Sequence, residues 1–371
     1  MHNYRDISLW KDIPLEKWVN WQWQIQNAIT SGEELEKVVA LTDDERTGVK
    51  AATQYLKLRI SPHIAAMINF SDHDKTLRRQ FIPSGEEVLS LDDDLLFSDV
   101  NADNRFSPIP GLIHRYPSKV LVFPSNYCGS YCRYCFRRKL NRDVETTLNK
   151  YDYETIFRYL RDNSQIEEVI FSGGDPLVIG DDLLEYILSS VQEIPHVQLV
   201  RLHTRMPVVI PYRITSNFLS LLKKYKPIFI VIHIDTLAEI SEQTKEAISA
   251  LVDNGIPCFA SCPLLKDIND NESVLRNLWT ELLRLRVKPY YLFHSDPVKG
   301  LRHFVVPIKR GLEIMKNLYD RMSGLAIPHY CFNVPNGGGH ILLNYNYVDE
   351  IREGHYIITT FEGNRFEYFE N

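Results

Sequence analysis

The sequence contains 371 residues, of which 44% are hydrophobic and 24% are charged, and its formal net charge is −6. This is the composition of an ordinary globular protein, and the charge gives no electrostatic reason to expect nucleic acid or an anionic membrane as a partner. No apolar run approaches the roughly 20 residues that cross a bilayer. The N-terminus has no signal-peptide pattern, and six cysteines are too few for a disulfide scaffold, so we expect a cytoplasmic location.

Residues 1–109 are predicted to form a helical N-terminal region. Trp18, Ile25 and Ile29 are spaced so that they would share one helix face, and Thr42 to Glu45 has the pattern of a capping box that opens a further helix. The tryptophan-rich stretch could form a ligand surface, but a core face or a contact with a partner subunit explains it better. A homo-oligomer is therefore expected.

From residue 110 to residue 327, apolar runs alternate with helical stretches. The six predicted strands are Val120–Phe123, Val169–Phe171, Leu199–Leu202, Ile228–Ile232, Cys258–Ala260 and Tyr290–Phe293. This alternation predicts an α/β fold with a parallel, helix-wrapped sheet or barrel, in which chemistry takes place at the C-terminal ends of the strands. Residues 328–371 read as a small β appendage, which we expect to cover the active site.

Three cysteines, Cys128, Cys132 and Cys135, follow the first predicted strand in a loop containing Gly and Ser. A four-iron cluster held only by protein takes four thiolates, so three would leave one iron open for another ligand. Zinc is an alternative, but no further cysteine or histidine pair nearby completes four ligands. Simple core packing fits a polar loop poorly.

Other polar groups follow later strands. The segment Ser172-Gly-Gly-Asp175 would let the backbone approach a ligand closely, and Asp175 could accept hydrogen bonds from an ammonium group. His233, and His294 to Asp296, also follow strands. Because parallel strands end at one edge, we expect these groups to meet the cysteine loop there.

The cysteine spacing, with Tyr134 before the third cysteine, resembles the signature of the radical S-adenosylmethionine (SAM) superfamily. That resemblance implies that SAM chelates the open iron and is cleaved to a 5′-deoxyadenosyl radical. Nearly the whole chain also resembles the lysine 2,3-aminomutase family. The matching motifs include Pro110–Pro117, Phe171–Leu177, Arg205–Pro211, Lys288–Leu292 and Pro335–His340. The family implies a partial (β/α)6 barrel, an amino-acid substrate, pyridoxal phosphate (PLP) and a flavodoxin- or ferredoxin-type reductant.

Carried over residue by residue, the resemblance implies four groups of site residues. Cys128, Cys132 and Cys135 would hold the cluster, and the residues implied to contact SAM are Tyr134, Gly173, Gly174, Asp175, Thr204 and Arg205. Arg137 would pair with the substrate α-carboxylate, which suits a guanidinium fork, although by itself it also fits a solvated helix face. Asp296 would bind a side-chain ammonium, and the residues implied at the PLP site are Arg115 and Lys119.

The sequence departs from the family at several of these positions. His340 stands where the family has the lysine that anchors PLP, and an imidazole cannot form the Schiff base, so PLP could bind only without a lysine aldimine. Asn333 replaces a second aspartate, which weakens the case for a cationic side chain. Ser261 lies where relatives have an Asn-Gln pair, and the tail lacks the cysteines that bind zinc in some relatives.

We therefore predict a radical SAM enzyme, aminomutase-like, that abstracts hydrogen from a free amino acid. The alternatives are PLP-independent dehydrogenation, epimerisation or hydroxylation, modification of a lysine on a partner protein, and a non-catalytic cluster module. His340 could act as an acid or base, donate to a phosphate, or be inert. Cys262 is most simply core packing, like Cys258 and Cys331, but it lies where it could donate a hydrogen atom to a substrate radical.

Overall fold

A nine-stranded sheet forms the centre of the computed structural model, which describes residues 3–71, 75–91, 93, 95–138, 145–225, 227–360 and 362–370. The strands are β1 (Leu112–Tyr116), β2 (Lys119–Ser125), β3 (Glu168–Gly173), β4 (Leu199–Thr204), β5 (Ile228–His233), β6 (Cys258–Leu264), β7 (Lys288–His294), β8 (His329–Val334) and β9 (Gly339–Leu342). They lie side by side in sequence order, and β2 to β8 are parallel. Strands β1 and β9 pair antiparallel at the two ends of the sheet, so the curled sheet is an open, partial barrel. The six predicted strands are β2 to β7, and the predicted fold class is confirmed.

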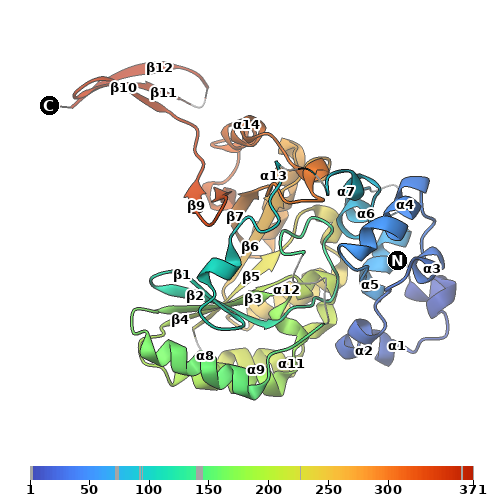
Figure 1. Cartoon of the computed structure of the whole chain (residues 1–371). Coiled ribbons are helices and arrows are strands. Elements are labelled where there is room, and N and C mark those ends of the chain that lie inside the picture. The colour runs from blue at the N-terminus through green and yellow to red at the C-terminus, as the bar shows by residue number, and fades with distance from the viewer. Residues whose placement is uncertain are drawn as a thin grey trace.

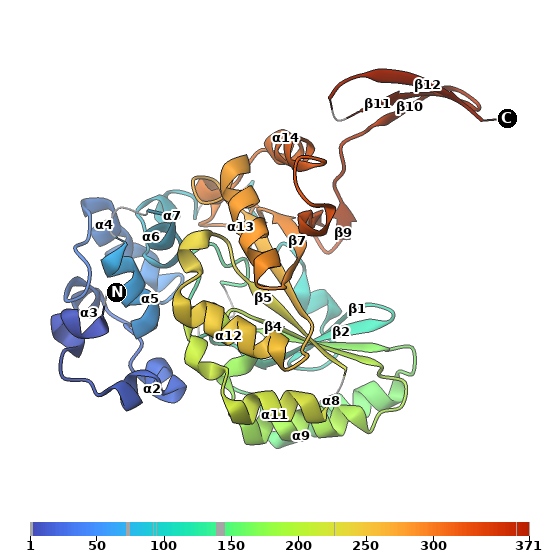
Figure 2. The ribbon, with the colours of Figure 1, turned by 180° about the vertical axis from the view of Figure 1, so that it is seen from behind.

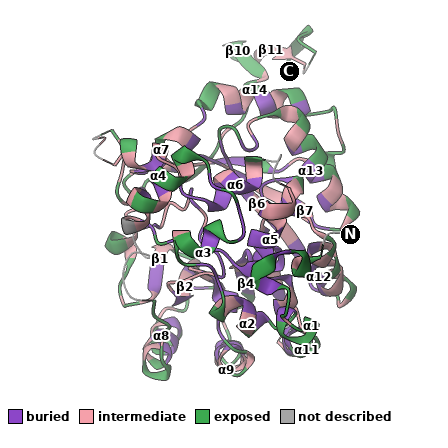
Figure 3. Cartoon of the chain, turned by 90° about the vertical axis from the view of Figure 1, so that its right-hand side faces the viewer, coloured by how far each residue is buried: buried purple, intermediate pink, exposed green. Residues whose placement is uncertain are grey.

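Helices cover the outer face of this sheet (Figure 2). They are α8 (Lys150–Asp162), α9 (Asp181–Gln192), α10 (Met206–Val209), α11 (Ser216–Lys224), α12 (Glu242–Asp253), α13 (Glu272–Arg284) and α14 (Ile308–Leu318). Polar caps begin several of them; Asn149, Thr215 and Ser241 each accept a backbone N–H of the first turn. Buried residues concentrate on the strands and on the sheet-facing sides of the helices (Figure 3). No helix within the described ranges is long and apolar enough to pass through a membrane.

The N-terminal residues form short helices packed at one side of the barrel (Figure 1). These helices are α1 (Leu15–Trp18), α2 (Trp21–Gln26), α3 (Gly32–Glu36), α4 (Asp43–Ala51), α5 (Pro62–Phe70), α6 (Lys75–Phe81) and α7 (Glu86–Leu89). The capping box at Thr42 is present, but α4 ends at Ala51. The expected single helix through Trp18 and Ile29 is wrong, because Asn20 caps a separate helix and Ile29 pairs as a β-bridge with Ile60.

The tryptophan-rich stretch packs inside the chain. Trp18 is buried, stacks on Tyr4 with ring centroids 4.0 Å apart, and donates from Nε1 to the hydroxyl of Tyr212 at 3.0 Å. Trp10 meets the same ring edge-on. These contacts favour the core interpretation of the tryptophans over a ligand surface.

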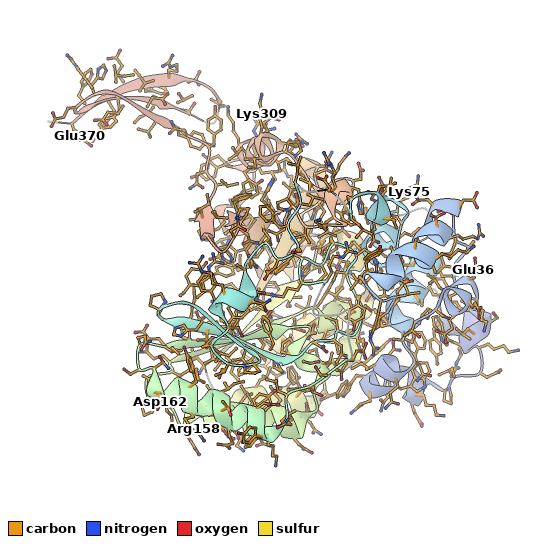
Figure 4. The ribbon with its side chains drawn as sticks, in the orientation of Figure 1. Glu36, Lys75, Arg158, Asp162, Lys309 and Glu370 are labelled. Atoms are coloured by element: carbon orange, nitrogen blue, oxygen red, sulfur yellow. The ribbon has the colours of Figure 1, made fainter. Side chains whose placement is uncertain are left out.

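The C-terminal residues divide into two parts. Strands β8 and β9 complete the barrel sheet, whereas β10 (Val348–Arg352), β11 (His355–Thr359) and β12 (Arg365–Phe369) form a separate antiparallel sheet. That sheet extends away from the barrel in both Figures 1 and 2, and Glu370 marks its far end in Figure 4. Residues 328–371 are predicted to form one appendage that covers the active site. Within this range β8 and β9 belong to the barrel sheet, and β10 to β12 do not.

Candidate active site

A cavity of about 330 Å³ opens at the C-terminal ends of the barrel strands. All sixteen residues predicted for the site line it: Arg115, Lys119, Cys128, Cys132, Tyr134, Cys135, Arg137, Gly173, Gly174, Asp175, Thr204, Arg205, Cys262, Asp296, Asn333 and His340. They come from β1 to β4, β6, β8 and β9, and from the loops that follow the strands, between residues 115 and 340. The parallel topology therefore brings the predicted residues together, while their individual roles stay predictions.

Buried polar atoms along this cavity lack partners within the described part of the chain. They include Nη2 of Arg115, Nε2 of His203, Nε of Arg205 and Oδ1 of Asn333. The pKa of His203 is lowered to about 3 by burial and by the charges of Arg201, Arg137 and His233, so its ring is neutral. Since buried polar groups are normally satisfied, this set fits a cavity that takes polar ligands carrying both donors and acceptors.

The cysteine loop follows β2, and its three thiols are free. Burial, Asp175 and the two neighbouring thiols raise the pKa of Cys128, and burial together with Cys132 raises the pKa of Cys135 to about 11. Because these thiols raise one another's pKa, three thiolates here need a bound cation to stay ionised. The donor set therefore fits an iron–sulfur cluster.

The loop is held from behind by a buried ion network. Arg133 donates from Nε and Nη2 to Glu87 at 2.9 and 2.7 Å, and Arg138 donates to the same carboxylate at 2.6 Å. All three side chains are at most 6% exposed. Nη1 of Arg133 donates to the carbonyls of Leu56 and Lys57. The N-terminal helices thus fix the position of the cysteines.

The glycine loop after β3 approaches the cysteine loop very closely. A Cβ on Gly174 would lie 2.3 to 2.6 Å from backbone atoms of Tyr127, and Gly173 has a φ of +102°. The carboxylate of Asp175 accepts from the backbone N–H groups of Leu177 and Arg205 at 2.9 and 2.7 Å, and from the hydroxyl of Thr204. Burial nevertheless raises the pKa of Asp175 to about 6. Asp175 thus ties the ends of β3 and β4 together, and the expected contact with a ligand ammonium stays a prediction.

Arg205 lies between the cysteine loop and β5. Its Nη1 donates to Sγ of Cys132 at 2.6 Å and to the hydroxyl of Tyr134 at 2.5 Å. Its Nη2 donates to Glu239 at 2.7 Å and is 3.4 Å from Asp235. The ring of Tyr134 also stacks on His233, with centroids 5.7 Å apart.

Another wall of the cavity presents Arg137, Asp296 and Asn333. Nε of Arg137 donates to Asp103 at 2.9 Å, and its guanidinium lies over the rings of Phe136 and Phe123. No described residue accepts from its Nη groups. Nδ2 of Asn333 donates to both oxygens of Asp296 at 3.0 and 3.3 Å. Burial raises the pKa of Asp296 to about 6, against the opposing effects of Asn333 and Arg137.

Arg115 and Lys119 form a positively charged end of the cavity, where His340 also lies. The hydroxyl of Tyr116 accepts the backbone N–H of His340 at 3.0 Å, and Nζ of Lys119 lies 4.8 Å from the centroid of the Tyr116 ring. Burial and the charges of Arg115, Lys119 and Arg137 lower the pKa of His340 to about 4, so the imidazole is neutral. The unpaired Nη2 of Arg115 fits a phosphate or carboxylate here. These residues therefore fit the phosphate of PLP, whereas His340 cannot anchor PLP covalently.

Several residues that the sequence did not single out complete the site. Asp103 orients Arg137, and Asp235 and Glu239 hold Arg205. Each lies far along the chain from its partner, so no local pattern could reveal the pairing. Arg201 and His203 carry a weak signal, because they alternate along β4 with the buried Val200 and Leu202.

Comparisons with known proteins agree with these motifs. The family model of the Radical SAM superfamily matches residues 122–277. L-lysine 2,3-aminomutase of Bacillus subtilis (strain 168) is 38% identical over 97% of this chain and 76% of its own length. Glutamate 2,3-aminomutase of Clostridioides difficile (strain 630) is 37% identical over 94% of this chain and 82% of its own. The crystal structure of Streptococcus suis SuiB bound to S-adenosylmethionine is 18% identical, with a TM-score of 0.45 over 59% of this chain and 51% of that one.

Proposed function

This chain is a radical SAM enzyme of the lysine 2,3-aminomutase family, and from that premise we propose that it abstracts a hydrogen atom from a free amino acid with a cationic side chain. The observation that carries the proposal is that the three cysteines line the same cavity as Arg137, Asp296 and Asn333. The relatives that act on lysine and on glutamate support a small amino-acid substrate.

Arg137 is the proposed anchor of the substrate α-carboxylate. Asp103 accepts from Nε, which leaves both Nη groups directed to a ligand, and the flanking phenyl rings restrict the guanidinium plane. A guanidinium fork held in this way binds a carboxylate through two parallel hydrogen bonds. Arg137 would thereby fix the Cα and Cβ of the substrate relative to the cysteine loop.

Asp296 and Asn333 are the proposed partners of the substrate side chain. Because a carboxylate only accepts, the amide of Asn333 must turn its NH₂ toward Asp296, which leaves Oδ1 of Asn333 without a partner among the described residues. The pair therefore offers three acceptor oxygens and one formal negative charge. An ammonium or guanidinium group, which only donates, satisfies all three. The loss of a second aspartate therefore removes one charge and one acceptor oxygen, and the remaining amide oxygen still faces a ligand as an acceptor.

SAM bound to the reduced cluster supplies the 5′-deoxyadenosyl radical that takes the hydrogen atom. The task of the protein is to orient one C–H bond and to exclude water. Apolar side chains of Val231, Leu265 and Phe304 line the cavity between the polar groups and are buried. This lining shields a carbon radical from solvent.

The fate of the substrate radical separates two candidate functions. PLP, when bound, supplies the route by which the amino nitrogen migrates from Cα to Cβ, which would give a β-amino acid. Arg115 and Lys119 favour this aminomutation, since they form an anion site. His340 favours the second candidate, a PLP-independent dehydrogenation or epimerisation. In an epimerisation, Cys262, which lines the cavity, would give a hydrogen atom to the substrate radical, and the resulting thiyl radical would be returned to the thiol by one electron from the reductant and one proton.

Isotope transfer tests the proposed function directly. Reconstituted enzyme with SAM and dithionite is expected to move deuterium from a deuterated basic amino acid into 5′-deoxyadenosine, detected by mass spectrometry. The same enzyme should label little from amino acids with neutral side chains. If no free amino acid transfers label although 5′-deoxyadenosine forms, a protein-bound substrate becomes the better assignment.

The pKa of Asp296 predicts a pH dependence for the side chain. Burial holds this pKa at about 6, so the carboxylate is ionised at pH 7 and becomes protonated as the pH falls below 6. The KM for a basic amino acid should rise about tenfold per pH unit below 6, because the cation loses its counter-charge. His340 and His203 stay neutral across this range.

Asp175, whose pKa is also about 6, is the main confounding group. Its protonation would affect all substrates, whereas Asp296→Asn should flatten only the pH dependence of the KM for basic ones. An unchanged pH profile in Asp296→Asn would contradict the assignment.

Borohydride reduction tests how PLP binds. The protein incubated with PLP and then reduced is expected to carry no covalently attached cofactor, since His340 cannot form a Schiff base. The variant His340→Lys restores the amine and should acquire the label, measured as a mass increase and mapped by peptide sequencing. Label on Lys119 of the unaltered protein would show instead that Lys119 is the anchor of PLP.

A further inference from the structure

A buried ion network lies directly behind one cysteine of the cluster loop. Arg205 donates to Sγ of Cys132, and among the described residues Cys132 is the one cluster cysteine that receives a hydrogen bond from a charged side chain. Cys135 accepts the backbone N–H of Arg137, and the charge of Asp175 raises the pKa of Cys128. The three thiols are therefore electrostatically unequal.

Several contacts fix Arg205 in place. Its backbone N–H donates to Asp175, its Nη2 donates to Gln80 and Glu239, and its guanidinium lies 4.6 Å from the centroid of the Phe81 ring. Arg205 itself is 6% exposed. These contacts hold the guanidinium beside Cys132.

Two carboxylates oppose this cation. Asp235 and Glu239 are fully buried, and Glu239 is fixed by the backbone N–H groups of residues 235 and 236, both at 2.8 Å. Asp235 accepts from the hydroxyl of Tyr134 and is 3.0 Å from Nε2 of His233. One positive charge thus touches the sulfur, and two negative charges lie directly behind it.

We propose that Arg205 and Asp235 set the reduction potential of the cluster in opposite directions, Arg205 through its hydrogen bond to Cys132 and Asp235 through its charge behind Arg205. Reduction adds one electron to the cluster. A cationic donor on a cluster sulfur stabilises the reduced state, whereas a nearby carboxylate destabilises it. Because the site is buried, solvent screens these charges weakly. Arg205 and Asp235 are thus positioning residues for electron uptake, a role beyond the contact with SAM that the family implies for Arg205.

The test is an EPR-monitored redox titration of the cluster in reconstituted protein without SAM, normalised to iron and sulfide content. Arg205→Gln is expected to lower the ratio of reduced to oxidised cluster at a fixed potential at least tenfold, which is 59 mV for one electron. Asp235→Asn should raise that ratio at least tenfold. Its new amide can donate to His233 while the remaining oxygen still accepts from Tyr134. Arg205→Lys, which keeps the charge but not the fork, should lie between Arg205→Gln and the unaltered protein.

Arg213→Gln is the matched control. Arg213 is also buried and charged, but it bonds to the carbonyls of Leu177 and Ile179 and to Asp181, and no cluster cysteine is among its partners. Shifts below tenfold, shifts of the same sign in Arg205→Gln and Asp235→Asn, or an equal shift in Arg213→Gln would overturn the proposal. If Arg205→Gln does not retain the cluster, the proposal is tested with Asp235→Asn and Arg205→Lys. Shifts in their reduced-to-oxidised ratio of less than tenfold, or shifts of the same sign, would overturn it.

The inference rests on the cluster that the proposed function requires, and the two can fail separately. Absence of a reduced-cluster EPR signal in the unaltered protein would refute both. A normal signal with unchanged potentials in the variants would refute only the role of Arg205 and Asp235.

Discussion

Glu87→Gln is expected to lower the free energy of unfolding by about 3–5 kcal/mol and to reduce the iron content of the reconstituted protein. Glu87 is the shared counter-ion of Arg133 and Arg138, and all three side chains are buried. Removing its charge leaves two buried guanidinium groups without a carboxylate, which is the costly way to break an ion pair. Because Arg133 belongs to the cysteine loop itself, the destabilisation should be concentrated where the cluster binds.

The pKa of Glu87 determines the pH range in which the ion network contributes to the free energy of unfolding. Burial alone would raise that pKa, but Arg133 and Arg138 hold it below the ordinary value. A lowered folded-state pKa means that the stabilisation is complete above the unfolded-state pKa and is lost only as the pH falls through the folded one. The measurement is therefore made at pH 7, by urea unfolding and iron assay.

Glu272→Gln is the control for Glu87→Gln. Glu272 also binds an arginine through two oxygens, at 2.9 Å each, but the side chains of Glu272 and Arg310 are 28% and 35% exposed. Such a surface pair contributes about 1 kcal/mol or less. If Glu87→Gln and Glu272→Gln lower the free energy of unfolding and the iron content equally, the buried network does not support the cysteine loop in the way we expect.

Arg137→Ala is expected to raise the KM for the amino-acid substrate at least about thirtyfold, which corresponds to about 2 kcal/mol. The α-carboxylate would lose both hydrogen bonds of the guanidinium fork, and Asp103 would be left without its cation. Arg137→Lys restores the charge but not the fork, so it should recover only part of the loss.

Arg158→Ala is the control for this variant, since Arg158 is an exposed arginine on α8 (Figure 4). Cluster content and 5′-deoxyadenosine release without substrate should be unchanged in all three variants. An unaltered KM in Arg137→Ala would remove the proposed carboxylate anchor.

The barrel strands, and the gathering of the predicted site residues around one cavity, could be predicted from sequence for the same reason. Strands buried on both faces read as continuous apolar runs, as in Ile228–His233, and a parallel sheet brings their ends to one edge. The charge pairs could not be predicted, because Glu87 and Arg133 are 46 positions apart and Arg137 and Asp103 are 34 apart. Only the fold brings such residues into contact.

Periodicity alone failed in the N-terminal region. Trp18, Ile25 and Ile29 have helical spacing, but Asn20 accepts the N–H of Trp23 and starts a new helix. At position 333 the sequence shows an asparagine, but it does not show which way the side-chain amide is turned. Only the contact with Asp296 shows which atom of the amide is left for a ligand.

Because Gly174 lies so close to Tyr127, almost no residue other than glycine can be accommodated at position 174. Even alanine would press its methyl group against main-chain atoms at 2.3 to 2.6 Å, and main chain cannot rotate away as a side chain can. A larger residue at position 174 would therefore displace the main chain that carries the cluster cysteines. A substitution of Gly174 that is intended to change the affinity for SAM should therefore first prevent assembly of the cluster. The purified protein would then be colourless and lack iron.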